Sequence, residues 1–252
     1  MISSDFATTV DSRIVRRDED MSRLPLGSPW RVQTVNLHHL ALSKEDKQFE
    51  AAIRAATYIT ADGWPVVALL RNAGIDCDRV TGSQWLRQAL STGTLRSARV
   101  GLLGGSAEAG RRLSVMLGSA LVFQDHRQNG DWEAEKLVAQ MRAAQVEVLL
   151  VAVTPPHGDL IAAELSKMML PASIIAVGGG LDMAVGLQHR APKWLADIGL
   201  EWAYRLARAP RRLARRYLLQ CVPFLISDLL PAIIAMKYRR RTAPESERPR
   251  AW

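Results

Sequence analysis

The segments EVLLVAV (147–153) and SIIAVGGG (173–180) decide the fold of this chain. Both are short apolar runs rich in β-branched residues, and the sequence between them predicts a helix at 159–169. Short apolar strands that alternate with helices are typical of a parallel sheet covered by helices on both faces. This part of the chain therefore indicates an α/β fold.

The same alternation continues toward the N-terminus. Strands are predicted at RVQTVNL (31–37), PVVALL (65–70), RVGLLGG (99–105) and ALVF (120–123). Helices are predicted at 43–60, 83–90, 106–118 and 131–144, with Ser83 as the N-cap of the second. We therefore expect residues 30–195 to form one α/β domain, a Rossmann-like parallel sheet with helices on both faces.

Ligands of such sheets bind at the carboxyl ends of the strands. The residues expected at that edge are Thr34, Asn36, Gly104, Gly105, Thr154 and Gly178–Gly180. In LLGGSAEAG (102–110) and AVGGGLD (176–182), glycines and a helix N-terminus would favour a phosphate. The turn at 102–110 has neither the dinucleotide fingerprint nor the Lys-Ser/Thr of a P-loop. Two interpretations of these glycines stay open: they bind a nucleotide-like ligand, or they only permit tight strand-to-helix connections.

The composition is that of a globular protein. The chain has 252 residues, of which 48% are hydrophobic and 23% are charged. Cys77 and Cys221 lie far apart without metal-binding spacing, which indicates a reducing compartment. Residues 1–29 are polar, contain two prolines and lack the apolar core of a signal peptide, so we expect a mobile N-terminal lead-in.

Positive charge is concentrated at the C-terminal end. Residues 196–252 contain twelve Lys or Arg and five Asp or Glu, a net charge of +7, whereas residues 1–195 have a net charge of +1. This distribution favours a localised anionic partner, such as a phospholipid surface, a pyrophosphate or a nucleic acid. Nucleic acid is disfavoured because the body lacks the aromatic and basic pattern of a known RNA-binding fold.

The basic end begins with APKWLADIGLEWAYRLARAPRRLARRYL (191–218), which has six arginines within twelve residues. Arg205, Arg208, Arg212 and Arg216 would share one helix face, and guanidinium groups suit pyrophosphate oxygens. Pro210 predicts that one helix ends near Arg208 and that a second one begins. The alternative is a basic helix that faces solvent or lipid.

An apolar segment follows, YLLQCVPFLISDLLPAIIAM (217–236), and then KYRRR (237–241). Its length suits a transmembrane helix, but its polar and proline residues argue against a clean span. An apolar amphipathic segment between arginine clusters favours an interfacial anchor over a packed C-terminal helix and over a span. We therefore expect residues 196–252 to form a basic amphipathic, membrane-associating appendage.

The acidic and histidine motifs give little chemistry by themselves. Asp62, in TADG (60–63), is either a general base at the sheet edge or a turn residue. RVTGS (79–83) offers a cation, a hydroxyl and a glycine in one turn, or simply a loop and an N-cap. His38, His39 and His157 form no zinc-type cluster and are expected to be structural or exposed. Asp76-Cys77-Asp78 and Asp18-Glu19-Asp20 are rejected as metal sites, because such short matches arise by chance.

Several segments, in order, resemble the WecG/TagA/CpsF family of bacterial glycosyltransferases, glycosyltransferase family 26. They are TVNLHHLALSKED (34–46), ADGWPVV (61–67), RVTGS (79–83), VGLLGG (100–105), EVLLVAV (147–153) and IIAVGGGLDMAVGLQHRAPKWLADIGLEWAYRLARAPRRLARRYL (174–218). The resemblance implies an inverting, metal-independent transferase without a cofactor. It would move a hexosyl or N-acetylhexosaminyl group from a UDP-sugar to a polyprenyl-pyrophosphate-linked acceptor. Family products feed exopolysaccharide, capsule, enterobacterial antigen or teichoic acid.

The resemblance also implies roles for individual residues. Asp62 matches the family's catalytic base, and Thr34, Asn36, Arg79 and Thr81 match acceptor-binding positions. The donor and nucleotide positions are Gly104, Gly105, Gly179 and Asp182, and the diphosphate-binding arginines are Arg205, Arg212 and Arg216. The expected location is the cytoplasmic face of the bacterial inner membrane, with peripheral attachment. The identity of the sugar and the acceptor, and homo-oligomer formation, stay open.

One segment departs from the family pattern. Where the family has Gly-x-Pro-Lys-Gln-Glu, this chain reads TPPHGD (154–159), with His157 and Gly158 in place of Lys and Gln and Asp159 in place of Glu. The departure puts donor-sugar recognition in question. It supports a second hypothesis, a divergent non-enzymatic protein that binds lipid-linked sugar or a partner enzyme. A third, a dinucleotide-dependent oxidoreductase, is disfavoured by the missing glycine fingerprint.

Overall fold

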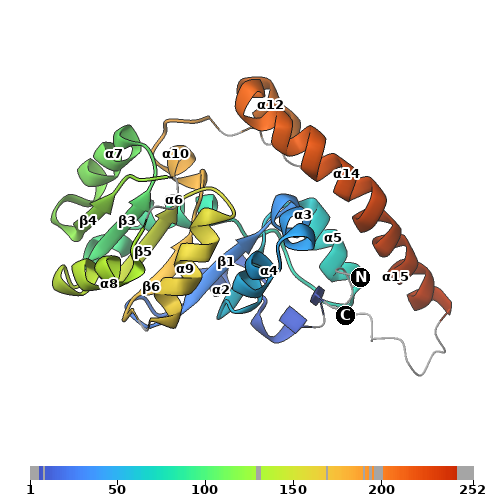
Figure 1. The fold of residues 1–252 in the computed structure, drawn as a ribbon, viewed down its shortest axis with the longest axis horizontal. Coiled ribbons are helices and arrows are strands. Elements are labelled where there is room, and N and C mark those ends of the chain that lie inside the picture. Colours follow the sequence, from blue (N-terminus) through green and yellow to red (C-terminus); the bar gives the residue numbers. More distant parts are fainter. Residues whose placement is uncertain are drawn as a thin grey trace.

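The body of the protein is a six-stranded parallel sheet with the strand order β2-β1-β6-β5-β3-β4 (Figure 1). The computed structural model describes residues 6–7, 9–128, 132–168, 170–189, 191–192, 195 and 201–242, without the side chains of Arg205, Arg212 and 239–242. The strands are β1 (Arg31–Val35), β2 (Tyr58–Ala61), β3 (Val100–Gly104), β4 (Leu121–Asp125), β5 (Val148–Ala152) and β6 (Ser173–Ala176). The predicted Rossmann-like α/β class is confirmed.

Helices cover both faces of this sheet. The helices of the body are α2 (Asp18–Ser22), α3 (Leu37–Glu45), α4 (Lys47–Arg54), α5 (Trp64–Asn72), α6 (Gly82–Ser91), α7 (Ala107–Leu117), α8 (Ala134–Ala143), α9 (His157–Lys167) and α10 (Gly180–Ala184), with short 3₁₀ turns η1 (Asp11–Arg13), η2 (Thr94–Ser97) and η3 (Gly118–Ala120). Leu102 and Leu150 pack with α6, α7 and α10, whereas Leu103 and Leu149 pack with α8 and α9. Successive strand residues point to opposite faces, so strands covered on both sides are apolar throughout.

The segment 58–72 differs from the prediction. The predicted helix 43–60 is α3, α4 and then strand β2, and the predicted strand 65–70 is helix α5. Gly63, with φ of +112°, turns the chain, and Pro65 lies in the first turn of α5, where its missing N–H costs no hydrogen bond. A short apolar run does not by itself separate a strand from a buried helix.

A second difference concerns the start of α6. Thr81, and not Ser83, is its N-cap, because the Thr81 hydroxyl accepts a hydrogen bond from the Gln84 amide. The helix therefore begins at Gly82. A Cβ at Gly82 would lie 2.9 Å from the Ala176 carbonyl oxygen, so only glycine allows α6 to begin this close to β6.

The described residues of the expected N-terminal lead-in pack against the body. Phe6, Val10 and Ile14 are buried in a core cluster with α4 and α5, and Ile14 forms a bridge with Ile59 of β2. Arg17 pairs with Asp76 and Asp78, with N–O distances of 2.8 and 3.0 Å. These two carboxylates of the rejected metal motif therefore hold the N-terminal segment to the domain.

The basic appendage is a long helical segment along one side of the body, beside α3 and α5 (Figure 1). Its elements are α12 (Glu201–Arg208), α13 (Pro210–Ala214), the π-helical segments η4 (Arg215–Cys221) and η5 (Leu225–Leu229), α14 (Val222–Phe224) and α15 (Leu230–Thr242). As predicted, Pro210 separates two helices and occupies the first turn of the second. Phe224 and Leu229 are buried against the α4 and α5 cluster.

The opposite side of the appendage is apolar and exposed. Its exposed residues are Leu218, Leu219, Ile226, Leu230, Ile234 and Tyr238. The helix Arg215–Tyr238 is long and apolar enough to cross a bilayer, and 17% of its apolar window is buried in the protein. Length and composition alone do not distinguish a span from a helix that lies at the membrane interface.

Candidate active site

A pocket of about 730 Å³ lies at the carboxyl ends of β1, β5 and β6 and beneath the appendage. The body contributes the residues that follow these strands and β2, together with the start of α6. The appendage contributes Tyr204, Arg208, Ala209, Leu213, Arg215, Arg216, Tyr217 and Gln220. The pocket is therefore built at the sheet edge where the sequence predicts a ligand, and its second wall comes from residues 204–220, which follow the whole sheet in the sequence.

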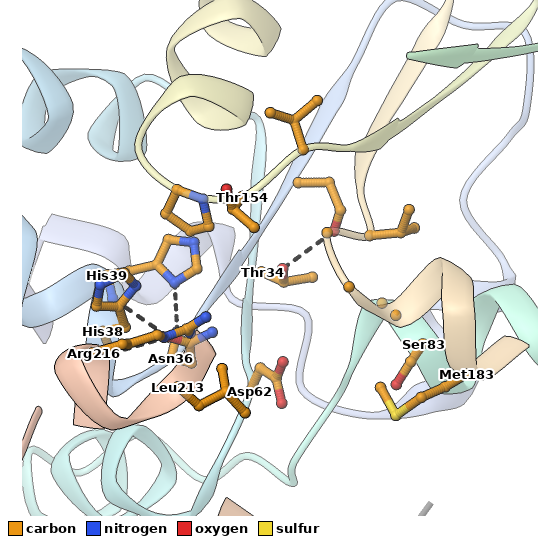
Figure 2. Close-up of a pocket in the computed structure, with 18 of the residues that line it drawn as sticks. Thr34, Asn36, His38, His39, Asp62, Ser83, Thr154, Met183, Leu213 and Arg216 are labelled. Atoms are coloured by element: carbon orange, nitrogen blue, oxygen red, sulfur yellow. Dashed lines mark hydrogen bonds between the residues drawn. The ribbon is translucent and has the colours of Figure 1, made fainter. Parts of the chain in front are cut away.

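Asp62 lines this pocket directly after β2. Its backbone N–H donates to the Val35 carbonyl oxygen at 2.8 Å, which fixes the turn beside the end of β1. The residue is half-buried, so its carboxylate can meet a ligand in the pocket. Figure 2 shows Asp62 near Thr34, with Ser83 and Met183 across the pocket.

Thr34 and Asn36 lie at the end of β1 and also line the pocket. The Thr34 hydroxyl donates to the Ala176 carbonyl oxygen at 3.2 Å, which leaves its lone pairs as acceptors. Asn36 is the N-cap of α3, and its Oδ1 accepts from the backbone N–H groups of His38 and His39. Because capping uses the amide oxygen, the Asn36 NH₂ group is the part that remains as a donor.

The arginines of the appendage form the positive wall. Arg208, Arg215 and Arg216 line the pocket, whereas the side chains of Arg205 and Arg212 lie outside the described part. Arg208 donates to the Tyr204 hydroxyl at 3.2 Å and lies 5.5 Å from that ring centroid. Figure 2 shows Arg216 reaching in beside Asn36 and the two histidines. These cations suit an anionic ligand.

His38 links α3 to the appendage, a role that the sequence does not indicate. Its Nε2 lies 2.8 Å from Gln220 Oε1, and the side chain is buried. Burial, reinforced by the Arg216 guanidinium, lowers the pKa of His38 to about 4, so the ring is neutral at physiological pH. A neutral ring accommodates a neighbouring arginine that an imidazolium would repel.

His39 ends a buried polar chain that begins at Arg31, the first residue of β1. Arg31 donates to Gln33 Oε1 at 2.9 Å, and Gln33 donates to Asp159 Oδ1 at 2.5 Å. His39 Nε2 lies 3.5 Å from the same Asp159 oxygen, and its Nδ1 accepts from the Asn36 N–H at 3.3 Å. This acceptor role assigns the ring proton to Nε2. The chain therefore joins β1, α9 and α3 beneath the pocket.

Arg79 and Thr81 do not line the described pocket, although the resemblance assigns both to acceptor binding. Arg79 Nη1 donates to Glu201 of α12 at 2.9 Å. Thr81 is buried, and its hydroxyl caps α6. The residues that follow it, Gly82 and Ser83, do line the pocket. The RVTGS turn thus places its glycine and serine at the site and its arginine against the appendage.

The four expected nucleotide positions separate into two groups. Gly179 lines the pocket, whereas Gly104, Gly105 and Asp182 do not. Gly104 has φ of +84°, and a Cβ there would lie 2.4 Å from Val153 Cγ2, so close packing of β3 on β5 accounts for this glycine. Asp182 accepts a hydrogen bond from Gln188 at 3.0 Å. The donor role of these three residues stays a prediction.

The divergent segment TPPHGD (154–159) has a structural reason for its glycine. A Cβ at Gly158 would lie 2.6 Å from the Val153 carbonyl oxygen, so a larger residue would have to move the start of α9. Thr154, Pro155, Pro156 and Asp159 line the pocket, and His157 is exposed. Asp159 stands where the family has Glu. Its side chain is buried and accepts a hydrogen bond from Gln33, so it forms part of the base of the pocket.

The site combines the half-buried Asp62 carboxylate and the buried Asp159 with several hydrogen-bonding groups and arginines. Within the described residues, no group of three or more His, Cys, Asp or Glu side chains could hold a metal ion. A half-buried carboxylate beside hydroxyl and amide groups can accept a proton from an alcohol, and arginines opposite it can neutralise a leaving phosphate. The arrangement therefore suits transfer of a group between an anionic donor and an alcohol.

Comparison with known families gives the same class of chemistry. The sequence model of the WecG/TagA/CpsF glycosyl transferase family matches residues 13–241, from the packed N-terminal segment to the last turn of α15. The match includes the body and the appendage, so both walls of the pocket lie within it. The chain belongs to the WecG/TagA/CpsF family of glycosyltransferases.

Proposed function

We propose that the protein is an inverting, metal-independent glycosyltransferase that moves a sugar from a UDP-sugar to a polyprenyl-pyrophosphate-linked acceptor. The observation that carries this proposal is the pocket itself, which has Asp62, Thr34 and Asn36 on the body side and Arg208, Arg215 and Arg216 on the appendage side. Such a pocket meets the two needs of the reaction, a base for the acceptor and positive charge for the leaving diphosphate.

The proposed step is a single displacement. The acceptor hydroxyl loses its proton to Asp62 while its oxygen forms a bond to the anomeric carbon of the donor. The bond from that carbon to the β-phosphate oxygen breaks on the opposite side, and UDP leaves with the electron pair. The arginines stabilise the charge that develops on the diphosphate. Attack opposite to the leaving group inverts the configuration at the anomeric carbon.

The acceptor lipid implies a place at a membrane. The exposed apolar side of the appendage and its arginines fit peripheral attachment to the cytoplasmic face of the bacterial inner membrane. We expect vesicles that contain anionic phosphatidylglycerol to bind the protein. Ile226→Glu, at a position 62% exposed on the appendage, should weaken this binding, whereas Val115→Glu, at a position 86% exposed on α7, should not. Equal effects of both substitutions would contradict membrane contact through the appendage.

The reaction is tested by UDP release from a panel of UDP-sugars, with membranes, a lipid-pyrophosphate-linked sugar and EDTA. We expect acceptor-dependent release from one donor. Asp62→Asn should reduce the rate by roughly 10²–10⁴-fold, because it removes the proton acceptor. Asp78→Asn is the matched control, since this carboxylate is exposed and lies outside the pocket. An unchanged rate in Asp62→Asn would exclude Asp62 as the base.

The second candidate is a non-enzymatic protein that binds lipid-linked sugar or a partner enzyme. The observation that favours it is the segment 154–159, where the acidic side chain is buried in contact with Gln33 and His39. This candidate predicts binding of the donor and the lipid without UDP release. It also predicts that Asp62→Asn leaves the binding of the donor and of the lipid unchanged.

A further inference from the structure

One face of α12 carries both its contact with the body and its contribution to the pocket. Glu201, Tyr204 and Arg208 are spaced by three and four residues, so they share one helix face. Tyr204 and Arg208 line the pocket. Glu201 begins the same face and pairs with Arg79, with an N–O distance of 2.9 Å. Trp202 does not line the pocket and is 39% exposed, with its ring centroid 6.1 Å from that of Tyr217.

Glu201 is unusual within its segment. Between residues 201 and 221 the sequence has six arginines and this single carboxylate. An acidic residue in the first turn is favoured by the helix dipole, but that effect requires no partner. Here the carboxylate contacts an arginine 122 residues away, and the side chains of Glu201 and Arg79 are only 15% and 27% exposed. A charge-assisted hydrogen bond that is largely shielded from water is strong and directional, so it fixes the position of Glu201 relative to Arg79.

The pair also joins the two walls of the pocket. Arg79 precedes Thr81 by two residues, and Thr81 caps the helix whose first residues, Gly82 and Ser83, line the pocket. A shift of Glu201 relative to Arg79 would therefore rotate α12 against that wall. A bare carboxylate at this place would also repel a diphosphate, and pairing with Arg79 neutralises it.

We propose that Arg79 and Glu201 are positioning residues whose ion pair sets the rotation of α12, so that Tyr204 and Arg208 face the pocket. The inference rests on the proposed function for the identity of the ligand, a nucleoside diphosphate. It gives Arg79 a role different from the acceptor contact that the family resemblance implies. Arg79 acts through the appendage and not through the substrate.

Charge exchange between the two residues tests the proposal. Arg79→Glu and Glu201→Arg each place two like charges together and should raise hydrogen exchange of the α12 backbone amides by about tenfold or more. The double variant Arg79→Glu/Glu201→Arg restores an opposite pair and should return the exchange rate toward that of the wild type. Arg79→Gln and Glu201→Gln are milder variants, which keep the test valid if a reversed charge prevents folding.

UDP binding, measured by calorimetry, is the functional readout. The single reversals should weaken UDP binding about tenfold, and the double variant should recover it, because Arg208 returns to the pocket. Lys136→Glu is the control. Lys136 lies on α8 and forms an exposed ion pair with Glu133, the N-cap of that helix, and α8 contributes no residue to the pocket. This substitution should leave α12 exchange and UDP binding unchanged.

Two results would overturn the inference. One is hydrogen exchange of the α12 backbone amides that stays at the wild-type rate in both single charge-reversal variants and in both glutamine variants. The other is a double variant that is as impaired as the single ones, which would show that Arg79 acts through its own charge on the ligand. If the wild type binds no UDP, the proposed function is wrong, and the exchange measurements still decide the role of the pair.

Discussion

Residues 1–195 carry a net charge of +1, whereas residues 196–252 carry +7. The two regions also differ in packing. The body has a core on both faces of its sheet, whereas the appendage buries one side against α3 and α5 and leaves the other exposed. The body supplies the carboxylate Asp62, and the appendage supplies arginines. Neither region has the complete pocket, because the carboxylate and the arginines that line it are held by different parts of the chain.

The largest expected effect is that of removing residues 196–252. We expect UDP release to fall to background, because the pocket loses its arginine wall. The melting temperature of the remaining body should also fall, since Phe224 and Leu229 no longer cover the core cluster around α5. Circular dichroism would show that the sheet is retained. Full UDP release by the truncated body would contradict this division of the site. It would mean that residues 1–195 bind the diphosphate without the arginines of the appendage.

A smaller effect is expected from Arg216→Ala. Loss of one cation aimed at the diphosphate should reduce kcat/KM on the order of 10²-fold. Arg216→Lys should have an intermediate effect, because it keeps the charge but not the planar guanidinium. Arg211→Ala is the matched control, since Arg211 is exposed on the same appendage and does not line the pocket. Equal losses for the two alanine variants would indicate that overall basic charge matters and that position does not.

The next effect depends on pH. Burial and Arg216 lower the pKa of His38 from 6.5 to about 4, so the unfolded chain binds this proton more readily than the folded protein. The contribution to stability is therefore complete above about pH 6.5 and is lost as the pH falls toward 4. Thermal unfolding between pH 7 and pH 5 measures this loss. His38→Gln removes the titration, and its stability should depend less steeply on pH. Parallel curves would contradict this role of His38.

The smallest effect is expected from Lys44→Ala. Lys44 pairs with Asp228 of the appendage at 2.6 Å, but these side chains are 50% and 30% exposed. Exposed ion pairs contribute about 0–1 kcal/mol, because solvent screens them. The free energy of unfolding, measured by urea titration, should therefore change by no more than about 1 kcal/mol, and the rate of UDP release should stay the same. A large loss of activity would mean that this exposed contact, and not the pocket side of the appendage, determines docking.

Much of the fold could be predicted from the sequence, because short apolar runs rich in β-branched residues alternate with longer helical segments along most of the body. β1, β3, β5 and β6 lie within predicted strands, β4 overlaps the predicted strand 120–123 and continues to Asp125, and α7, α8 and α9 correspond to predicted helices. The segment 58–72 could not be predicted in this way. Tyr58–Ala61 is a short strand that continues the apolar spacing of α4, and α5 is apolar enough to resemble a strand.

The sheet pattern places Thr34, Asn36 and Gly179 at the carboxyl edge of the sheet, and all three line the pocket. The family resemblance singles out Asp62 and Arg216, which also line it. The sequence does not indicate that His38, His39 and Asp159 belong to the site. The partner of His38, Gln220, is distant in the sequence, and the partner of Asp159, Gln33, belongs to no recognisable motif. Arg79 shows the same limit, because its contact with Glu201 depends on how the appendage docks.

The late position of the arginine wall has a consequence for biosynthesis. Domains fold from the N-terminus as the chain leaves the ribosome, and the sheet of this protein is complete at Ala176. Arg208, Arg215 and Arg216 emerge afterwards, followed by the apolar side of the appendage. We therefore expect a nascent chain to have a folded body before it can hold a diphosphate. Activity would then be acquired only after residues 208–216 have been made, and the exposed apolar side of the appendage follows them directly.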